Sequence, residues 1–238
     1  PRISGRGVLT ALAWTHDRLP TYAFEGIITC SAATLTWLRD QLGLIKDVRE
    51  TEALARAVDD NGGVYLVPAF SGLGAPYWSE AARAAIVGLS AHSDRRHVVR
   101  AALESIAYQL RDVLDAMRVE SGVALGSLRG DGGATANAFL MQFVADLTRA
   151  ELSVASNPDF SPLGAAMMGS LGCGIAPSVS ALAHLPRAEN VYRPTMEISR
   201  AQSLHAGWQR AVCQVLPHAP SPAGAGSANP AGPLVPRL

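Results

Sequence analysis

The chain has 238 residues, of which 48% are hydrophobic and 17% are charged, enough apolar material for one sizeable buried core. Twenty basic residues balance twenty acidic ones, and this neutrality argues against strongly charged partners such as nucleic acid or an anionic membrane. No apolar run reaches the roughly 18 residues that a membrane helix needs. The first residue is Pro1 and not methionine, which favours a fragment, a processed product or a trimmed chain.

The first elements in chain order are short strands at residues 8–14 and 22–24, joined as a hairpin by a loop of five or six residues. Two helices follow. The first covers residues 32–42, where leucines recur on one stripe. The second begins at Thr51, which we expect to cap it, and ends at the Asp-Asp-Asn-Gly-Gly run of residues 59–63.

The middle of the chain starts with a buried strand at residues 64–68 and a Gly- and aromatic-rich loop at 71–79. A further strand at residues 85–89 precedes the longest helical pattern, which covers residues 97–118. Apolar residues recur there every three or four positions, so one face of this helix is expected in the core.

The last third predicts strands at residues 125–129 and 151–155 and helices at 136–147, 163–172 and 199–216. Strands alternating with helices indicate an α/β domain with both faces of its sheet covered. From Pro217 the composition changes to Pro, Ala, Gly and Ser. We therefore predict one domain over residues 1–216 and a disordered tail over 217–238.

The three cysteines, Cys30, Cys173 and Cys213, lie far apart in sequence. An odd number with no CxxC spacing argues against a disulfide framework and against a zinc knuckle. We therefore expect buried, reduced thiols in a cytoplasmic protein.

A strand runs into Asp131-Gly132-Gly133 and then opens a helix. Glycines let a ligand approach the backbone closely, and free N–H groups at a helix start favour an anion or a polar ligand. Asn137, one turn into the helix, could offer a donor and an acceptor to a heterocycle or a ribose. The same pattern is also typical of a tight connection that binds nothing.

Other polar residues favour structural roles. Asp131 would cap the helix or orient the glycine turn, and His97 would lie at a helix start as a surface or capping residue. Arg83 could reach a phosphate, although an ion pair is the simpler expectation. Arg100 and Glu104 are expected on the solvated face of the long helix. No metal-ligand spacing and no Ser–His–Asp or Cys–His arrangement stands out.

Several motifs together resemble the FGGY family of carbohydrate kinases, and glycerol kinases within it, over roughly residues 7–212. The spacing from Ala84 through Gly88 to His97 and Glu104 resembles the second family signature. The segments that carry the glycerol kinase likeness are AFSGLGAPYW at 69–78, LESIAYQLRDVLDAM at 103–117 and GDGGATANAFLMQF at 130–143.

This resemblance implies a ribonuclease H-like domain of the actin, hexokinase and sugar-kinase superfamily, with a mixed sheet and helices on both faces. It implies the C-terminal, ATP-binding half of a kinase that converts ATP and glycerol to ADP and glycerol 3-phosphate. The implied partners are an adenine nucleotide, a small polyol or sugar and an N-terminal kinase domain, without nucleic acid or a membrane. A homo-oligomer is left open.

The resemblance also carries over positions that contact the nucleotide in the family. Ala32 and Thr36 stand where the family has Gly and Gln, so those two contacts are altered here. The loop around Val48 would lie along the adenine. The full set of positions implied to contact the nucleotide is Gly132, Gly133, Asn137, Ala32, Thr36 and Val48.

The family's catalytic Asp and its Gly-Thr-Gly phosphate turn belong to the first half, so the resemblance implies no catalytic residue in this chain. Mg²⁺ would be held mainly by the nucleotide and by that first half. The alternatives are a non-catalytic nucleotide-binding or assembly domain, and a kinase for another sugar or polyol such as xylulose. A Rossmann-type dehydrogenase is disfavoured because no glycine fingerprint follows a first strand.

Overall fold

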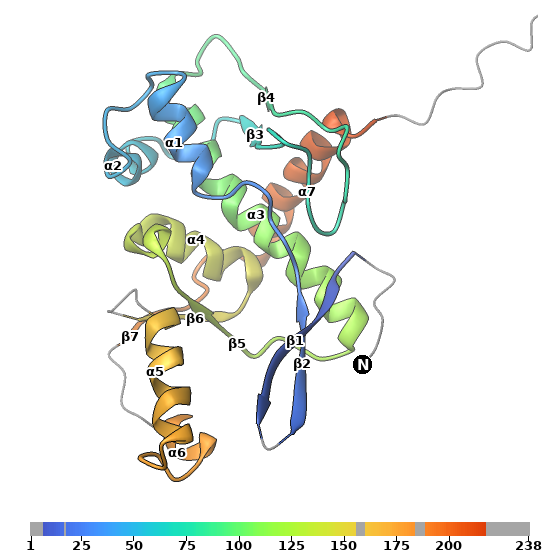
Figure 1. Cartoon of the computed structure of the whole chain (residues 1–238). Coiled ribbons are helices and arrows are strands. Elements are labelled where there is room, and N and C mark those ends of the chain that lie inside the picture. The colour runs from blue at the N-terminus through green and yellow to red at the C-terminus, as the bar shows by residue number, and fades with distance from the viewer. Residues whose placement is uncertain (1–6, 17, 156–159, 184–188, 218–238) are drawn as a thin grey trace, which may run out of the picture.

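The structure is a computed structural model that describes residues 7–16, 18–155, 160–183 and 189–217 (Figure 1). Helices and strands alternate along most of the described chain, as predicted for an α/β protein. Most of the tail for which we predicted disorder, residues 218–238, lies outside the described residues. Among the described residues, no helix is long and apolar enough to cross a bilayer.

The described strands form three small sheets. Two are antiparallel pairs: β1 (Leu9–His16) with β2 (Leu19–Glu25), and β3 (Tyr65–Val67) with β4 (Ala85–Val87). The third is a mixed sheet of β5 (Ser127–Gly130), β6 (Glu151–Ala155) and β7 (Glu189–Tyr192). In it, β6 lies in the middle, parallel to β5 and antiparallel to β7.

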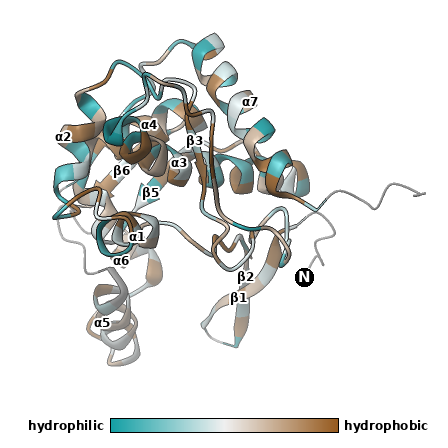
Figure 2. Ribbon diagram, turned by 90° about the horizontal axis from the view of Figure 1, so that it is seen from above, coloured by the Kyte–Doolittle hydropathy of each residue, from teal (hydrophilic) through white to brown (hydrophobic). Residues whose placement is uncertain are grey.

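Helices make up most of the rest of the described chain. They are α1 (Ala33–Asp40), α2 (Glu50–Arg56), α3 (Arg95–Ser121), a 3₁₀ turn η1 (Gly133–Ala136), α4 (Ala138–Thr148), α5 (Phe160–Gly172), α6 (Val179–Ala183) and α7 (Ile198–Val215). Figure 2 shows α2 and α7 on opposite sides of the central α3, while the β1–β2 hairpin and α5 project away from this body.

The core lies along α3, whose Leu103 and Ala107 are fully buried. Tyr108 of α3 stacks on Trp208 of α7 with ring centroids 5.4 Å apart, and meets Phe143 of α4 edge-on. Three helices therefore share one aromatic cluster, the kind of large apolar contact that dominates core energetics. The apolar periodicity predicted for α3 is confirmed, and the helix predicted at residues 199–216 is present as α7.

The predicted hairpin loop was too long, and two elements were not predicted. β1 ends at His16 and β2 begins at Leu19, so the hairpin loop is shorter than the five or six residues expected. The strands continue because Thr15 pairs with Pro20 across them, and backbone pairing does not require apolar side chains. The short α6 and the edge strand β7 were not predicted, since neither sequence shows an apolar period.

Side-chain burial corrects several further expectations. Arg100 and Glu104 are not solvated; they are 9% and 1% exposed and form an ion pair of 2.8 Å. Within the part of the chain that the structure describes, Arg83 forms no ion pair and instead donates to the carbonyl oxygens of Glu80 and Ala82. The thiols are free, as expected. However, only Cys30 is buried, whereas those at positions 173 and 213 are exposed.

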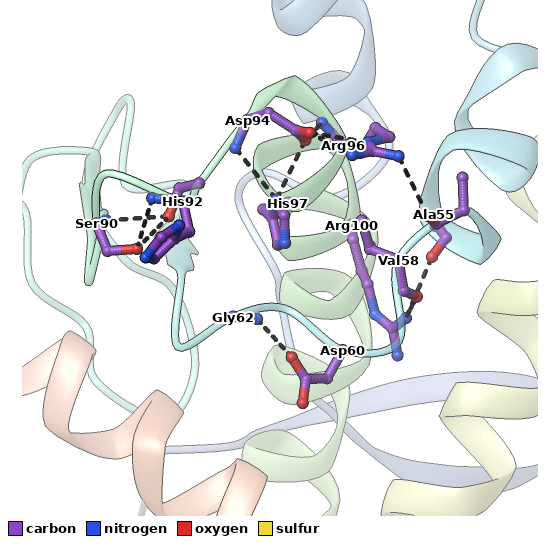
Figure 3. A network of polar contacts seen from close by, with 12 residues as sticks. Ala55, Val58, Asp60, Gly62, Ser90, His92, Asp94, Arg96, His97 and Arg100 are labelled. Carbon is purple, nitrogen blue, oxygen red and sulfur yellow. Dashed lines mark hydrogen bonds and ion pairs between the residues drawn. The ribbon is translucent and has the colours of Figure 1, made fainter.

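The predicted capping role of His97 is confirmed. The side chain of Asp94 accepts from the backbone N–H of Arg96 at 2.8 Å, and the backbone N–H of Asp94 donates to Nδ1 of His97 at 3.1 Å. This capping box begins α3 (Figure 3).

Candidate functional site

A cavity of about 170 Å³ lies where α1, α2 and the start of α4 meet. This volume is below the roughly 300–1,000 Å³ of sites that enclose a whole small molecule, so the cavity suits one end of a ligand. Its wall combines apolar, polar and charged side chains. The lining residues are Leu35, Val48, Arg49, Thr51, Glu52, Gly133, Ala134, Ala136, Asn137 and Leu140.

The glycine turn forms one side of this cavity. Gly132 has φ +95°, a conformation that favours glycine, and its N–H donates to Oδ1 of Asp131 at 2.7 Å. Asp131 therefore orients the turn, one of its two predicted roles. The hydroxyl of Thr135 donates back to the carbonyl oxygen of Gly132 at 2.7 Å. A Cβ added at Gly133 would meet no atom within 4 Å, so this backbone is open to a ligand.

The first turn of α4 differs from the prediction of free N–H groups. Oδ1 of Asn137 accepts from the N–H of Leu140 at 2.9 Å, so Asn137 is the N-cap of α4. Oε2 of Glu52 accepts from the N–H of Ala138 at 3.0 Å. Two protein oxygens therefore occupy N–H groups at this helix start that an anion would otherwise bind.

A second link crosses from α4 to α2. Nδ2 of Asn137 donates to Oγ1 of Thr51 at 3.2 Å, and that hydroxyl donates to the carbonyl oxygen of Val48 at 2.6 Å. Thr51 thus lies inside α2 and does not cap it, which corrects the prediction. The result is a short polar chain that joins both walls of the cavity.

Charges of both signs line the cavity or pair with residues that line it. The Arg49 side chain, which is 90% exposed, pairs with Asp47, and hydrogen bonds from Arg49 hold the pKa of the Asp47 carboxyl well below its usual range. Glu52 pairs with Arg56 at 3.0 Å. The carboxylate of Glu52 is therefore the charge that lies nearest to the start of α4.

The six predicted nucleotide positions separate into two groups. Val48, Gly133 and Asn137 line the cavity, and Gly132 adjoins it in the turn. Ala32 and Thr36 do not line it: both are exposed, and Leu35 between them provides the contribution of α1.

Sequence reasoning missed the α2 contribution, above all Thr51 and Glu52. A signal was present, because polar residues in the first turn of a helix often bind a neighbouring backbone. Nothing in the sequence indicated that the partners of Thr51 and Glu52, the Asn137 side chain and the Ala138 backbone, belong to a segment 86 residues away.

The C-terminal domain model of the FGGY family of carbohydrate kinases matches residues 1–173. This chain belongs to the FGGY family. Among curated proteins, it is 48% identical over 213 residues to glycerol kinase from Shewanella sediminis and 46% identical over 213 residues to glycerol kinase from Alkaliphilus metalliredigens. Each match covers 90% of this chain and 43% of the relative, so the chain spans less than half the length of these FGGY kinases.

Two solved structures superpose on this chain. Plasmodium falciparum glycerol kinase with ADP superposes with a TM-score of 0.83 at 34% identity, over 91% of this chain and 43% of that one. Xylulose kinase from Lactobacillus acidophilus, at 18% identity, superposes with a TM-score of 0.74 over 90% of this chain and 43% of that one. The second likeness concerns the fold alone. Together with the family match, these comparisons confirm the predicted α/β fold class of the sugar-kinase superfamily.

Proposed function

We propose that this chain forms the nucleotide-binding part of an ATP-dependent kinase whose acceptor is a polyol, and that this polyol is glycerol. The observation that carries the proposal is the cavity beside an open Gly132–Gly133 turn in a chain of this family. The glycerol assignment is supported by relatives that are 46% to 48% identical and named glycerol kinases. The nucleotide is supported by a relative solved with ADP.

The polarity of the cavity supports one orientation of the nucleotide. Leu35, Val48 and Leu140 provide an apolar surface for the adenine. Phosphates are disfavoured at the start of α4, because Asn137 and Glu52 already take its N–H groups and the Glu52 carboxylate repels an anion. We therefore place the phosphates over the glycine turn.

The transfer step needs more than this chain provides in our proposal. We propose that the general base and the Mg²⁺ ligands belong to the remaining part of a longer kinase, with Mg²⁺ arriving on the nucleotide phosphates. On this proposal the chain alone binds adenine nucleotide but does not phosphorylate glycerol. Domain closure onto the remaining part would complete the site. We propose that this kinase acts in the cytoplasm.

The β1–β2 hairpin supports docking of that remaining part. Both of its faces carry apolar side chains, a pattern typical of strands that are covered on both sides. Leu12 and Tyr22 pair across one face and are 58% and 47% exposed, while Trp14 and Leu19 are 50% and 72% exposed. The occupant we propose is the kinase half that the relatives have and this chain does not match.

Calorimetry with ADP tests the nucleotide site. Gly133→Ala should keep the fold, since the added methyl meets no atom, and should weaken ADP binding by roughly tenfold by blocking close approach. Gly126→Ala is the matched control, because its Cβ also meets no atom and it lies outside the cavity. Absence of heat at millimolar ADP for the parent chain would favour a non-catalytic remnant or an assembly domain.

A coupled ADP-release assay tests the division of labour. The chain alone should show no turnover with glycerol, and adding the separately produced N-terminal half of a glycerol kinase should restore it. Turnover by the chain alone would refute the proposed absence of the base. Turnover of the mixture with xylulose and not glycerol would favour the alternative acceptor.

A further inference from the structure

Arg100 does not line the proposed nucleotide cavity, but it contacts α2 and α4, which do. It projects from α3, is 9% exposed, and its Nε donates to Oε1 of Glu104 at 2.8 Å. Glu104 in turn accepts from Nδ2 of Asn61 at 2.9 Å and from the hydroxyl of Tyr108 at 3.1 Å. Burial raises the pKa of Glu104, whereas Arg100 and these other donors oppose that shift. The guanidinium is thus held in one orientation.

The other side of the guanidinium faces the end of α2. Nη1 of Arg100 donates to the carbonyl oxygens of Ala55 at 3.2 Å and Val58 at 2.6 Å (Figure 3). The last carbonyls of a helix have no partner within it, so Arg100 caps α2 from outside. The opposite end of α2 carries Thr51 and Glu52, which line the cavity.

The same guanidinium also meets the opposite wall. Its central carbon lies 5.1 Å from the ring centroid of Phe139, within cation–π range. Phe139 is in the first turn of α4, next to Ala138, whose N–H binds Glu52. One buried cation therefore contacts both elements that Thr51–Asn137 and Glu52–Ala138 join at the cavity.

We infer that Arg100 is a positioning residue for the nucleotide cavity, which sets the spacing of α2 and α4 by capping α2 while its guanidinium lies over Phe139. This inference rests on the proposed nucleotide site and adds a determinant to it. Lysine cannot replace the side chain in this role. A single ammonium can pair with Glu104 but lacks the planar fork that also reaches two carbonyls and stacks on a ring.

The test compares Arg100→Lys with Tyr108→Phe. We expect Arg100→Lys to weaken ADP binding roughly tenfold and to speed hydrogen exchange at the backbone amides of α2. Tyr108→Phe keeps the aromatic ring and the α2 contacts but loses one hydrogen bond to Glu104. It should lower the thermal midpoint by roughly 3 °C and leave ADP affinity within about twofold.

A second variant covers poor folding of Arg100→Lys. Phe139→Leu keeps the ion pair of Arg100 and Glu104 and removes the ring under the guanidinium, so it should also weaken ADP binding. It also removes the contacts of that ring with Arg56 and Phe143, so its stability is measured beside its affinity. The inference is overturned if Arg100→Lys leaves both ADP affinity and α2 exchange unchanged. It is also overturned if Arg100→Lys and Phe139→Leu lose ADP affinity only in proportion to their loss of thermal stability. If the parent chain binds no ADP, the proposed function fails, and α2 exchange in Arg100→Lys still decides the positioning role.

Discussion

Single buried polar side chains hold together segments that are far apart in this chain. Asp112 of α3 is 6% exposed and accepts from Tyr77 at 2.8 Å, from Nε1 of Trp208 at 2.6 Å and, across a 2.6 Å contact, pairs with Nε2 of His205. Burial raises the pKa of Tyr77 well above its usual range, and the Asp112 carboxylate raises it further. Hydrogen bonds to Asp112, as well as apolar packing, therefore hold the aromatic loop at 71–79 against α3 and α7.

At the same scale, the ionisation of Asp94 should make the stability of the folded chain depend on pH. Hydrogen bonds, chiefly from Arg96, hold the Asp94 pKa well below its usual range, so its ionised form favours the folded state. This contribution is present above the ordinary aspartate pKa of about 3.9 and is lost as the pH falls through the lowered value. Asp94→Ala should therefore lower the thermal midpoint at pH 7.

Thermal unfolding followed by circular dichroism from pH 7 to pH 2 checks this prediction. The difference between Asp94→Ala and the parent chain should shrink steadily at the acid end. Asp94→Asn is the control, since it keeps an acceptor for the cap without the charge. A difference that stays constant over the whole range would contradict the assigned role of the ionised carboxylate.

At the scale of elements, α7 approaches β3 closely because the α7 residue that faces Tyr65 of β3 is a glycine, Gly207. A Cβ built at Gly207 would stand 2.0 Å from the hydroxyl oxygen of Tyr65. That hydroxyl donates to the carbonyl oxygen of Leu204, one turn earlier in α7. A helix at residues 199–216 was predicted from the sequence, but the need for glycine at this position depends on a strand some 140 residues earlier.

Gly207→Ala should destabilise the domain by about 1–3 kcal/mol, because overpacking outweighs the better helix propensity of alanine. Gly169→Ala in the exposed helix α5 is the comparison, since its Cβ meets no atom within 4 Å. There the propensity term stands alone and should stabilise by about 0.5–1 kcal/mol. Urea denaturation measures both values, and two shifts of the same sign would contradict the close contact.

At the scale of the whole molecule, α7 belongs to the core although the family match ends at residue 173. Trp208 is fully buried, and Ala201, Ala211 and Val212 are each 1% exposed. We therefore propose that the domain extends over residues 1–216 and does not include residues 217–238.

Two truncations test this boundary. A chain that ends at Thr195 removes α7 and should lose cooperative thermal unfolding, because the Tyr108 ring would lose its stacking partner in the core. A chain that ends at Pro217 should unfold at the same temperature as the parent. A stable domain without α7, or a large loss on removing only the tail, would contradict the proposed boundary.

Local patterns of the sequence were sufficient for most of the helices and strands, the glycine turn of Gly132 and Gly133 and the His97 cap, because each depends on residues within one or two turns. The same patterns placed Arg100 and Glu104 in solvent and did not identify Thr51 or Glu52 as part of the cavity. Burial of a charge depends on partners that only the fold supplies, here Asn61, Val58 and Phe139. The sequence by itself therefore determined most of the elements and one wall of the site. The tertiary structure alone decided how α2 and α4 meet to complete the cavity.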